Sequence, residues 1–444
     1  MQKNQRVNET HRSLSVTLLS IALGGASIGI ARLLLMAIDF FTNLFYFQRF
    51  SLEDASPAQN QMGMTAIFVP VFGGLVVGLL ARFGSSAIRG HGIPEAMENI
   101  LLKESKIPGR VTWLKPLSAA LSIGSGGPFG AEGPIIATGG ALGSFVGQII
   151  HLNSLERKII LAAGAASGMT AIFGTPFAAL LLAIELLLFE FSARTFIPVA
   201  LAVGVSSLIR NTFFSSTPFI AIQPLQYPTL QGLGLFLAFG VIFGLLSILV
   251  TKAVYWIEDQ FEHLPVHWMY WPAIGGFAVG LIGFACPASL GVGYSNITQT
   301  LTANLTMRAA LLLVVFKFVS WAIALGSGTS GGTLAPILTV GSGLGFIFAM
   351  ATSKLFPHLQ IDVPMCALVG MVSLFAGCSR ATLASVVFAL EATHQQACLV
   401  PALITCGIAH LISMNYMTNS IMTEKIVRRG THVPHSYFPE SLAE

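Results

Sequence analysis

Charged side chains are scarce in this sequence. Only 9% of its 444 residues are Asp, Glu, Lys or Arg, whereas a soluble domain contains about 25%. Hydrophobic residues make up 54% of the chain. The shortage of charge excludes an ordinary soluble protein and predicts a polytopic membrane protein, with nearly all of the chain in or against the lipid bilayer. The net charge of +4 comes from basic residues scattered through short loops, so no nucleic-acid partner is expected.

Cysteine is also sparse, and its spacing fits neither a disulfide framework nor a zinc site. The five cysteines lie in apolar surroundings, where we expect small buried side chains. His263 and His267 are one helical turn apart, but Pro265 lies between them, so we expect no metal and no cofactor. We also expect no cleavable signal peptide, because the first apolar run is too long for one.

Apolar runs are plentiful but unequal in length. The first extends from about Leu14 to Phe41. The run at 113–123 is shorter than the roughly 20 residues that cross hydrocarbon, whereas the run at 158–189 can hold two helices or one tilted helix. These lengths predict an all-α polytopic membrane protein with tilted, partial and re-entrant helices. Basic residues near each end predict that both termini are cytoplasmic: Lys3, Arg6, Arg12, Lys425, Arg428 and Arg429.

The two halves of the sequence resemble each other. The segment GSGGPFGAEGPIIATGGALG at Gly124–Gly143 aligns without a gap with GSGTSGGTLAPILTVGSGLG at Gly326–Gly345. Farther along, GTPFAALLLAIE ends at Glu185 and RATLASVVFALE ends at Glu391, at nearly the same spacing. We therefore predict a duplicated membrane protein, divided into a cytoplasmic tail at 1–13, repeats at 14–215 and 216–424, and a second cytoplasmic tail at 425–444.

Each copy contains a Gly-rich turn that leads into a helix with proline near its start. Proline is tolerated there because its missing N–H has no partner in the helix. The free N–H groups and the positive dipole end of such a helix attract anions. Interrupted helices at matching places in two repeats indicate the binding site of a transporter. The alternative is that the glycines only allow close helix packing.

Four short motifs follow one another along the chain. They are GHGIP at Gly90–Pro94, GAEGP at Gly130–Pro134, GTLAP at Gly332–Pro336 and NSIM at Asn419–Met422. With the repeat, they resemble the CLC family of chloride channels and chloride/proton antiporters, whose motifs are GSGIP, GREGP, GxFxP and a tyrosine near the last helix. The resemblance extends from about residue 15 to residue 430.

The resemblance implies a CLC-like fold of two inverted-topology repeats with re-entrant helices. It also implies a homodimer in which each subunit has its own pathway for chloride or another small anion. The bacterial type, without regulatory CBS domains, fits best, so we expect a protein of the bacterial inner membrane. The chain is expected to be a transporter and not an enzyme.

The resemblance also implies roles for individual residues. Glu132 matches the gating glutamate: its ionised carboxylate is itself an anion and can block the site until chloride competition or protonation releases it. The anion would be bound mainly by backbone N–H groups at the starts of three helices. The residues expected around it are His91, Gly92, Ile93, Ala131, Gly133, Thr333 and Leu334.

Three departures from the family pattern bear on the expected mechanism. His91 replaces a serine, and if it were protonated beside the anion it would tighten binding at low pH. Leu186 replaces the second glutamate of the antiporters, so the inner proton position is apolar. Met422 falls at the position of the anion-contacting tyrosine and cannot donate a hydrogen bond. Glu190 lies one turn beyond Leu186, either as a relocated proton acceptor or as an interfacial charge.

The leading hypothesis is chloride transport gated by Glu132, with weak or no proton coupling because Leu186 cannot accept a proton. Chloride/proton antiport with a relocated acceptor, and selectivity for fluoride or nitrate, are alternatives within the same family. An intramembrane hydrolase using Ser167 and His410 is a remote alternative. A cation-coupled carrier of organic solutes would need buried carboxylates, but Glu185 and Glu391 occupy matched repeat positions and are expected to be structural.

Overall fold

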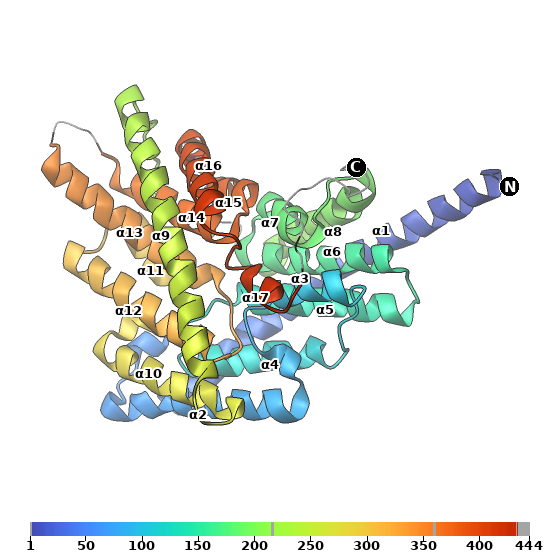
Figure 1. Cartoon of the computed structure of the whole chain (residues 1–444), viewed down its shortest axis with the longest axis horizontal. Helices are drawn as coiled ribbons and strands as arrows, with labels where there is room; N and C mark the ends of the chain where they lie inside the picture. Colours follow the sequence, from blue (N-terminus) through green and yellow to red (C-terminus); the bar gives the residue numbers. More distant parts are fainter. Residues whose placement is uncertain (1, 215–216, 358–360, 432, 434–444) are drawn as a thin grey trace.

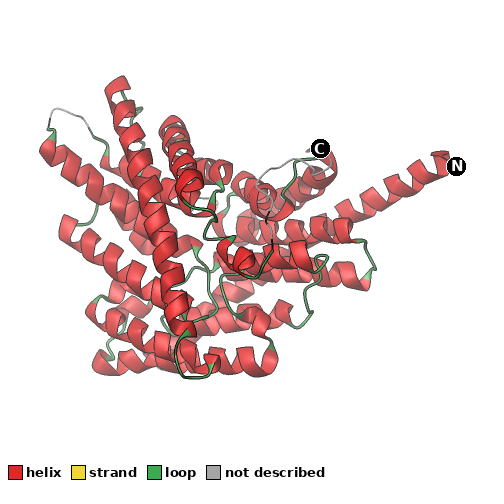
Figure 2. Cartoon of the chain, viewed as in Figure 1, coloured by secondary structure: helices red, strands yellow, loops and turns green. Residues whose placement is uncertain are grey.

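The computed structural model describes residues 2–214, 217–357, 361–431 and 433. Within these ranges the chain forms helices joined by loops, and its β-type pairings are two isolated bridges (Figure 2). Eight helical segments of the described chain are long and apolar enough to cross a membrane. The chain is therefore an all-α integral membrane protein, as its composition predicted.

The helices of the two halves follow one another in the same order (Figure 1), so that α1 corresponds to α9 and α8 to α16. The predicted boundary between the repeats, at 215 and 216, lies outside the described residues. The first half contains α1 (Gln2–Phe47), α2 (Phe68–Leu79), α3 (Ile93–Leu102), α4 (Val111–Gly124), α5 (Glu132–Ile149), α6 (Ser154–Phe173), α7 (Pro176–Ala183) and α8 (Ala193–Phe213). The second half contains α9 (Leu230–Glu262), α10 (Trp271–Ala285), α11 (Tyr294–Leu301), α12 (Met307–Gly326), α13 (Leu334–Leu355), α14 (Val363–Ser379), α15 (Thr382–Thr393) and α16 (Leu399–Tyr416), and α17 (Glu424–Arg428) follows them.

The two ends of the chain differ from the predicted tails. The first helix, expected to begin near Leu14, begins at Gln2, so the polar N-terminal segment is the projecting end of α1 (Figure 1). The reason is local, since residues 2–13 contain neither glycine nor proline to stop the helix. At the other end, the segment expected as a tail begins inside α17, which packs against α3.

The long apolar run at 158–189 holds two helices. Helix α6 ends at Phe173, where Gly174 adopts a left-handed conformation (φ 68°), and α7 begins at Pro176. A π-helical turn, η5 (Ile184–Leu188), continues α7. The short α7, α14 and α15 confirm the prediction of partial helices, because none of them is long enough to span the membrane alone.

The two repeats cap each other's helices. The carboxylate of Glu391 at the end of α15 accepts hydrogen bonds from the N–H groups of Phe177 and Ala178 at the start of α7, at 3.0 and 2.8 Å. In return, Glu185 in η5 accepts from the N–H groups of Leu383 and Ala384 at the start of α15, at 3.0 and 2.9 Å. The N–H groups of a helix's first turn have no partner within the helix, so these bonds confirm the structural role predicted for both glutamates.

A buried lysine in each repeat holds the loop before a short helix. Lys115 in α4 donates from Nζ to the carbonyl oxygens of Ile88 and Gly90, at 2.8 and 2.9 Å. Lys317, its counterpart in α12, donates to the carbonyl oxygens of Ser289 and Gly291, at 3.2 and 2.7 Å. A charge in an apolar interior needs such partners. The two lysines therefore fix the loops that lead into α3 and α11.

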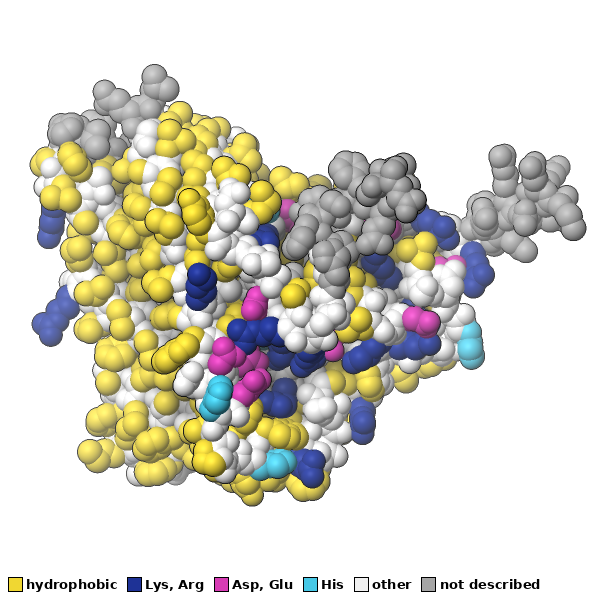
Figure 3. Space-filling model, viewed as in Figure 1, with side chains coloured by type: hydrophobic (Ala, Val, Ile, Leu, Met, Phe, Trp, Pro, Cys, Tyr) yellow, Lys and Arg dark blue, Asp and Glu magenta, His cyan; other side chains and the backbone are white. Residues whose placement is uncertain are grey.

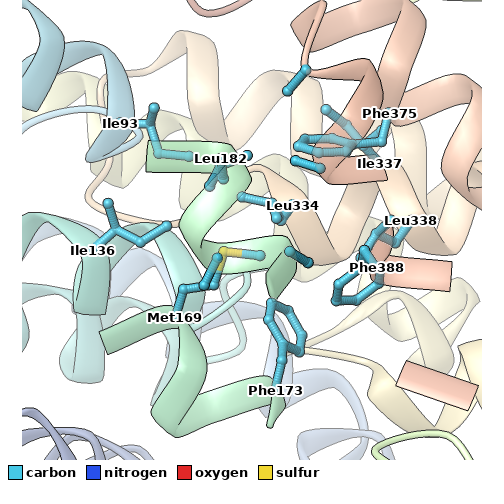
Figure 4. Packing of buried hydrophobic residues seen from close by; sticks show 14 of the residues in the cluster. Ile93, Ile136, Met169, Phe173, Leu182, Leu334, Ile337, Leu338, Phe375 and Phe388 are labelled. Carbon is cyan, nitrogen blue, oxygen red and sulfur yellow. The ribbon is translucent and has the colours of Figure 1, made fainter. Parts of the chain in front are cut away.

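The core forms where helices of both repeats meet. Helices α5 and α6 pack closely because Gly139 and Gly164 face each other, and a Cβ on either would lie 2.2 Å from the other's carbonyl oxygen. Around them, aliphatic and aromatic side chains from α3, α5, α6, α7, α13, α14 and α15 form one cluster (Figure 4). The labelled members are Ile93, Ile136, Met169, Phe173, Leu182, Leu334, Ile337, Leu338, Phe375 and Phe388.

Candidate functional site

Three of the four sequence motifs meet in the interior of the protein. Gly130 and Gly332 exchange backbone hydrogen bonds, with N···O distances of 3.3 and 3.1 Å. The N–H of Gly331 donates to the carbonyl oxygen of Gly90 at 3.4 Å. The loops before α3, α5 and α13 therefore lie side by side, and the starts of these three helices come together as the sequence predicted.

Glycine is required where these loops touch. A Cβ on Gly133 would lie 2.1 Å from the carbonyl oxygen of His91 and 2.7 Å from the Cα of Gly332. A Cβ on Gly92 would lie 2.3 Å from the carbonyl oxygen of Gly133, and Gly92 has a φ of 97°, which side chains disfavour. The glycines thus allow the backbones of both repeats to approach one point.

The residues around this point are closed off from the surface. His91, Glu132, Thr333 and Leu334 are each at most 2% exposed, and Ile93, Ala131 and Gly133 are buried with them. Nδ1 of His91 and Oγ1 of Thr333 have no hydrogen-bond partner among the described residues. The predicted residues of the first three motifs are therefore brought together in a small, buried and partly polar site.

Gly92 corrects one detail of the prediction. Its N–H, expected to face an anion, donates to Oε2 of Glu95 at 2.6 Å. This bond is part of the N-terminal cap of α3, in which a glutamate three positions after the cap residue turns back to the cap N–H. Gly92 therefore lets the backbones of the two loops come close together, but its N–H is not free to bind an anion.

Glu132 is the first residue of α5, and its carboxylate lies at the junction of the helix starts. Oε1 accepts a hydrogen bond from the hydroxyl of Tyr294 at 2.5 Å. The backbone N–H groups of Glu132 itself and of Ala335 in α13 also interact with this carboxylate. A carboxyl group thus occupies the place where two helix N-termini favour an anion.

Tyr294, the first residue of α11, was not among the residues predicted from the sequence. The repeat itself carried the missing signal, because Gly291-Val292-Gly293-Tyr294 in the second half corresponds to Gly90-His91-Gly92-Ile93 in the first. Both segments precede a short helix and are held by a buried lysine. Extending the alignment of the repeats to this loop would have placed Tyr294 opposite Ile93, next to the site.

The fourth motif lies in the turn before α17. Met422 is fully buried there, and its N–H donates to Oγ of Ser420 at 3.2 Å. The same part of the chain reaches α3, since Nζ of Lys425 lies 3.5 Å from Oε1 of Glu95. The turn that contains Met422 is therefore close to α3, but no hydrogen bond among the described residues joins Met422 to Glu132.

The predicted inner position is apolar and buried, but its relation to Glu190 was predicted incorrectly. Leu186 lies in η5 and is 4% exposed. This turn ends at Leu188, and Phe189 is left-handed with a φ of 54°, so the chain turns away before Glu190. Glu190 therefore does not lie one helical turn beyond Leu186 on the same face. It is half-buried and interacts electrostatically with Lys158.

A group of charged side chains covers α3 and α17 on the face shown in Figure 3. Glu95 and Glu258 both approach Lys425, at 3.5 and 3.8 Å. Burial opposes ionisation of Glu95, but Lys425 and the neighbouring groups lower its pKa to about 2. Burial lowers the pKa of His91 to about 4. Glu95 is thus charged and His91 neutral at ordinary pH.

The remote hydrolase alternative has no matching geometry. Ser167 lies in the middle of α6, where its carbonyl oxygen accepts a hydrogen bond from the Ser206 hydroxyl at 3.0 Å. The ring Nδ1 of His410 pairs with the hydroxyl of Thr382 at 2.6 Å. The histidine thus bonds a threonine of the neighbouring α15 and not the proposed nucleophile.

Known transporters are similar to this chain in sequence. The transporter described as the H(+)/Cl(-) exchange transporter ClcA of Klebsiella pneumoniae (strain 342) is 32% identical over 345 residues, covering 76% of this chain and 72% of the relative. The protein of the same description from Salmonella typhi is 32% identical over 351 residues, covering 76% of this chain and 74% of the relative.

Solved structures share the architecture. A slow cyanobacterial Cl⁻/H⁺ antiporter superposes with a TM-score of 0.84 at 21% identity, covering 93% of this chain and 97% of the other. A CLC-type fluoride/proton antiporter superposes with a TM-score of 0.72 at 21% identity, covering 92% and 97%. The two inverted repeats are thus the CLC fold.

The family model described as "Voltage gated chloride channel" matches residues 72–414. This range includes the three motifs that meet at Glu132 and both glutamates that cap the opposite repeat. Members of this family transport anions and are not enzymes. The chain belongs to the CLC family of voltage gated chloride channels.

Proposed function

We propose that this protein carries chloride through a pathway gated by Glu132, with weak or no coupling to protons. The observation that carries the proposal is the position of the Glu132 carboxylate, fully buried where the N-termini of α5 and α13 meet. A carboxylate there excludes another anion from the same place. Protonation removes its charge, or chloride displaces it, and the pathway opens.

The anion would be held mainly by backbone N–H groups. The helix starts at Ile93, Ala131–Gly133 and Thr333–Leu334 are buried and lie close together. Their burial excludes competing water, which strengthens electrostatic attraction. His91 and Thr333 add polar atoms that have no partner among the described residues. Met422 would line the inner side of the path without donating a hydrogen bond.

Weak coupling follows from the inner position. A proton that crosses the membrane needs an acceptor at each end of its route, because a bare charge in hydrocarbon is costly. Glu132 supplies one acceptor, while Leu186, buried in η5, cannot supply the other. Chloride would therefore move mainly down its own electrochemical gradient.

Chloride/proton exchange is the second candidate. It is favoured by the descriptions of the relatives from Klebsiella and Salmonella as H(+)/Cl(-) exchange transporters. In that case another group must replace Leu186 as the inner acceptor. Glu190 is the candidate that the sequence offered, although its separation from the face of Leu186 weakens it.

We further propose that the protein works as a homodimer in the bacterial inner membrane, with both termini in the cytoplasm. The family resemblance and the relatives from two bacteria support this placement. The basic residues near α17 and in the first part of α1 support the orientation.

The test is the reversal potential of purified protein in liposomes under crossed chloride and pH gradients. We expect the potential to follow the chloride gradient and to change little with the pH gradient. Uphill proton movement driven by chloride, at a fixed integer ratio, would instead establish exchange. Repeating the chloride measurement with fluoride and nitrate gives the selectivity of the same site.

A further inference from the structure

We propose that Tyr294 is a positioning residue, whose hydroxyl holds the Glu132 carboxylate in the pathway and sets the pH at which the gate releases. The inference rests on the proposed function, because it assumes that Glu132 is the gate. It adds a second residue to that gate, contributed by the other repeat.

The hydrogen bond between the two residues favours one state of the gate. The Tyr294 hydroxyl lies 2.5 Å from Oε1 of Glu132, within the range of a strong bond to an ionised acceptor. A hydroxyl that donates to a carboxylate stabilises its charged form. Protonation of Glu132 weakens this bond, because a neutral carboxyl group is a poorer acceptor than a carboxylate, and movement away from the helix starts breaks it. The bond therefore stabilises the charged, blocking position specifically.

The aromatic ring of Tyr294 is fixed by its neighbours. It meets Phe219 edge-on with ring centroids 5.0 Å apart, and Phe173 edge-on at 6.2 Å. Phe173 also packs edge-on against Phe388 of α15, at 5.0 Å. Such edge-to-face contacts stabilise rings in one orientation. The hydroxyl is thus held toward Glu132 by side chains from α6, α15 and the loop before α9.

The backbone below Tyr294 is fixed as well. Gly293 is left-handed (φ 76°) and is the N-terminal cap residue of α11, while Lys317 anchors the preceding carbonyl oxygens of Ser289 and Gly291. Among the described residues, the titratable groups that interact with Glu132 are Tyr294 from α11 and Lys317 from α12. From α13 only the N–H of Ala335 does so. The interaction between Lys317 and Glu132 is the same whether or not residue 294 has a hydroxyl. Lys317 therefore does not account for an effect of removing that hydroxyl alone.

The test replaces the hydroxyl and keeps the ring. Tyr294→Phe removes one hydrogen bond to a charged group, which corresponds to a shift of about one pH unit in the protonation of that group. We expect the pH of half-maximal chloride flux to rise by about one unit, and flux at neutral pH to increase by up to about ten-fold. The measurement is chloride efflux from liposomes between pH 4 and pH 8.

Tyr46→Phe is the matched control. Tyr46 is also buried, and its hydroxyl donates to the carbonyl oxygen of Ser125 at 2.9 Å, away from Glu132. We expect the control to keep the wild-type pH profile. An equal shift in both variants would show a general effect of losing a buried hydroxyl and would overturn the proposal.

Two further variants separate this inference from the proposed function. Glu132→Gln should lose the acid response, and Glu132→Gln with Tyr294→Phe should behave like Glu132→Gln alone, because the tyrosine acts through the carboxylate. If Glu132→Gln loses the acid response while Tyr294→Phe keeps the wild-type profile, the gate stands and the role of Tyr294 is refuted. If Glu132→Gln keeps the acid response, the gate itself is wrong, and the inference falls with it.

Discussion

The close approach of the repeats at Gly133 can be tested by adding a single methyl group. In Gly133→Ala the new Cβ would lie 2.1 Å from the carbonyl oxygen of His91, whereas a carbon and an oxygen in contact are normally about 3.3 Å apart. The start of α5 must therefore move by more than about 1 Å from the loop before α3, and a misplacement of this size in a functional site can cost about 100-fold in rate. We therefore expect chloride flux to fall by at least about ten-fold.

The assay compares chloride flux of the purified variant with that of Gly140→Ala in the same helix. At Gly140 the added Cβ would lie 3.3 Å from the side chain of Leu161, which can move, and 3.7 Å from the carbonyl oxygen of Leu161, an ordinary contact distance. Alanine favours a helix over glycine by about 1 kcal/mol, so neither change should weaken α5 itself. Wild-type flux in Gly133→Ala, at equal expression and with a single peak in size-exclusion chromatography, would refute the contact between the two repeats.

Three more predictions follow from the same geometry. Thr333→Pro should reduce chloride flux much more than Thr333→Ser, because proline removes an N–H at the start of α13; equal flux at matched expression would refute binding by the backbone. Glu391→Ala should lower the free energy of unfolding by about 2–4 kcal/mol, because two N–H groups at the start of α7 lose a charged acceptor. Glu391→Gln should lower the free energy of unfolding by less. Thermal unfolding in detergent measures both variants, and an unchanged midpoint would refute the capping role. Burial lowers the pKa of His91 to about 4, below the value of about 6.5 in an unfolded chain, so the unfolded state binds more protons between these values and the folded state loses stability as pH falls from about 6.5 to 4. His91→Ser should reduce this loss in a melting series over that range, and a parallel loss in the variant would show that another group is responsible.

The motifs of the site were readable in the sequence because they depend on local rules. A Gly-rich turn followed by a helix with proline near its start keeps its meaning wherever the fold places it, and the two copies showed that Gly130 and Gly332 belong to one site. The structural role of Glu185 and Glu391 was predictable for the same reason, from their matched positions.

Other features depend on contacts that no local pattern specifies. Tyr294 comes close to Glu132 only after α11 has been packed against α13. The repeat places it opposite Ile93, but a tyrosine at a helix start has no chemical signature of its own. The helix around Leu186 ends because Phe189 adopts a left-handed conformation, which is uncommon for a bulky residue. No glycine or proline marks the end of this helix, so the sequence predicted one continuous helical face from Leu186 to Glu190. The bond from Gly92 to Glu95 differs from these features, because a glutamate three positions after a cap residue is a local capping pattern.

The reciprocal caps at Glu185 and Glu391 have a consequence for biogenesis. Residues 176–178 leave the ribosome long before Glu391 is made, so the newly inserted first half holds both a carboxylate and helix N–H groups without their final partners. Neither half can satisfy these groups alone, and each supplies what the other lacks. The protein is therefore expected to insert as two incomplete halves that mature together in one late step. Two fragments divided near the middle of the chain should assemble when produced in the same cell, while either fragment alone should be degraded.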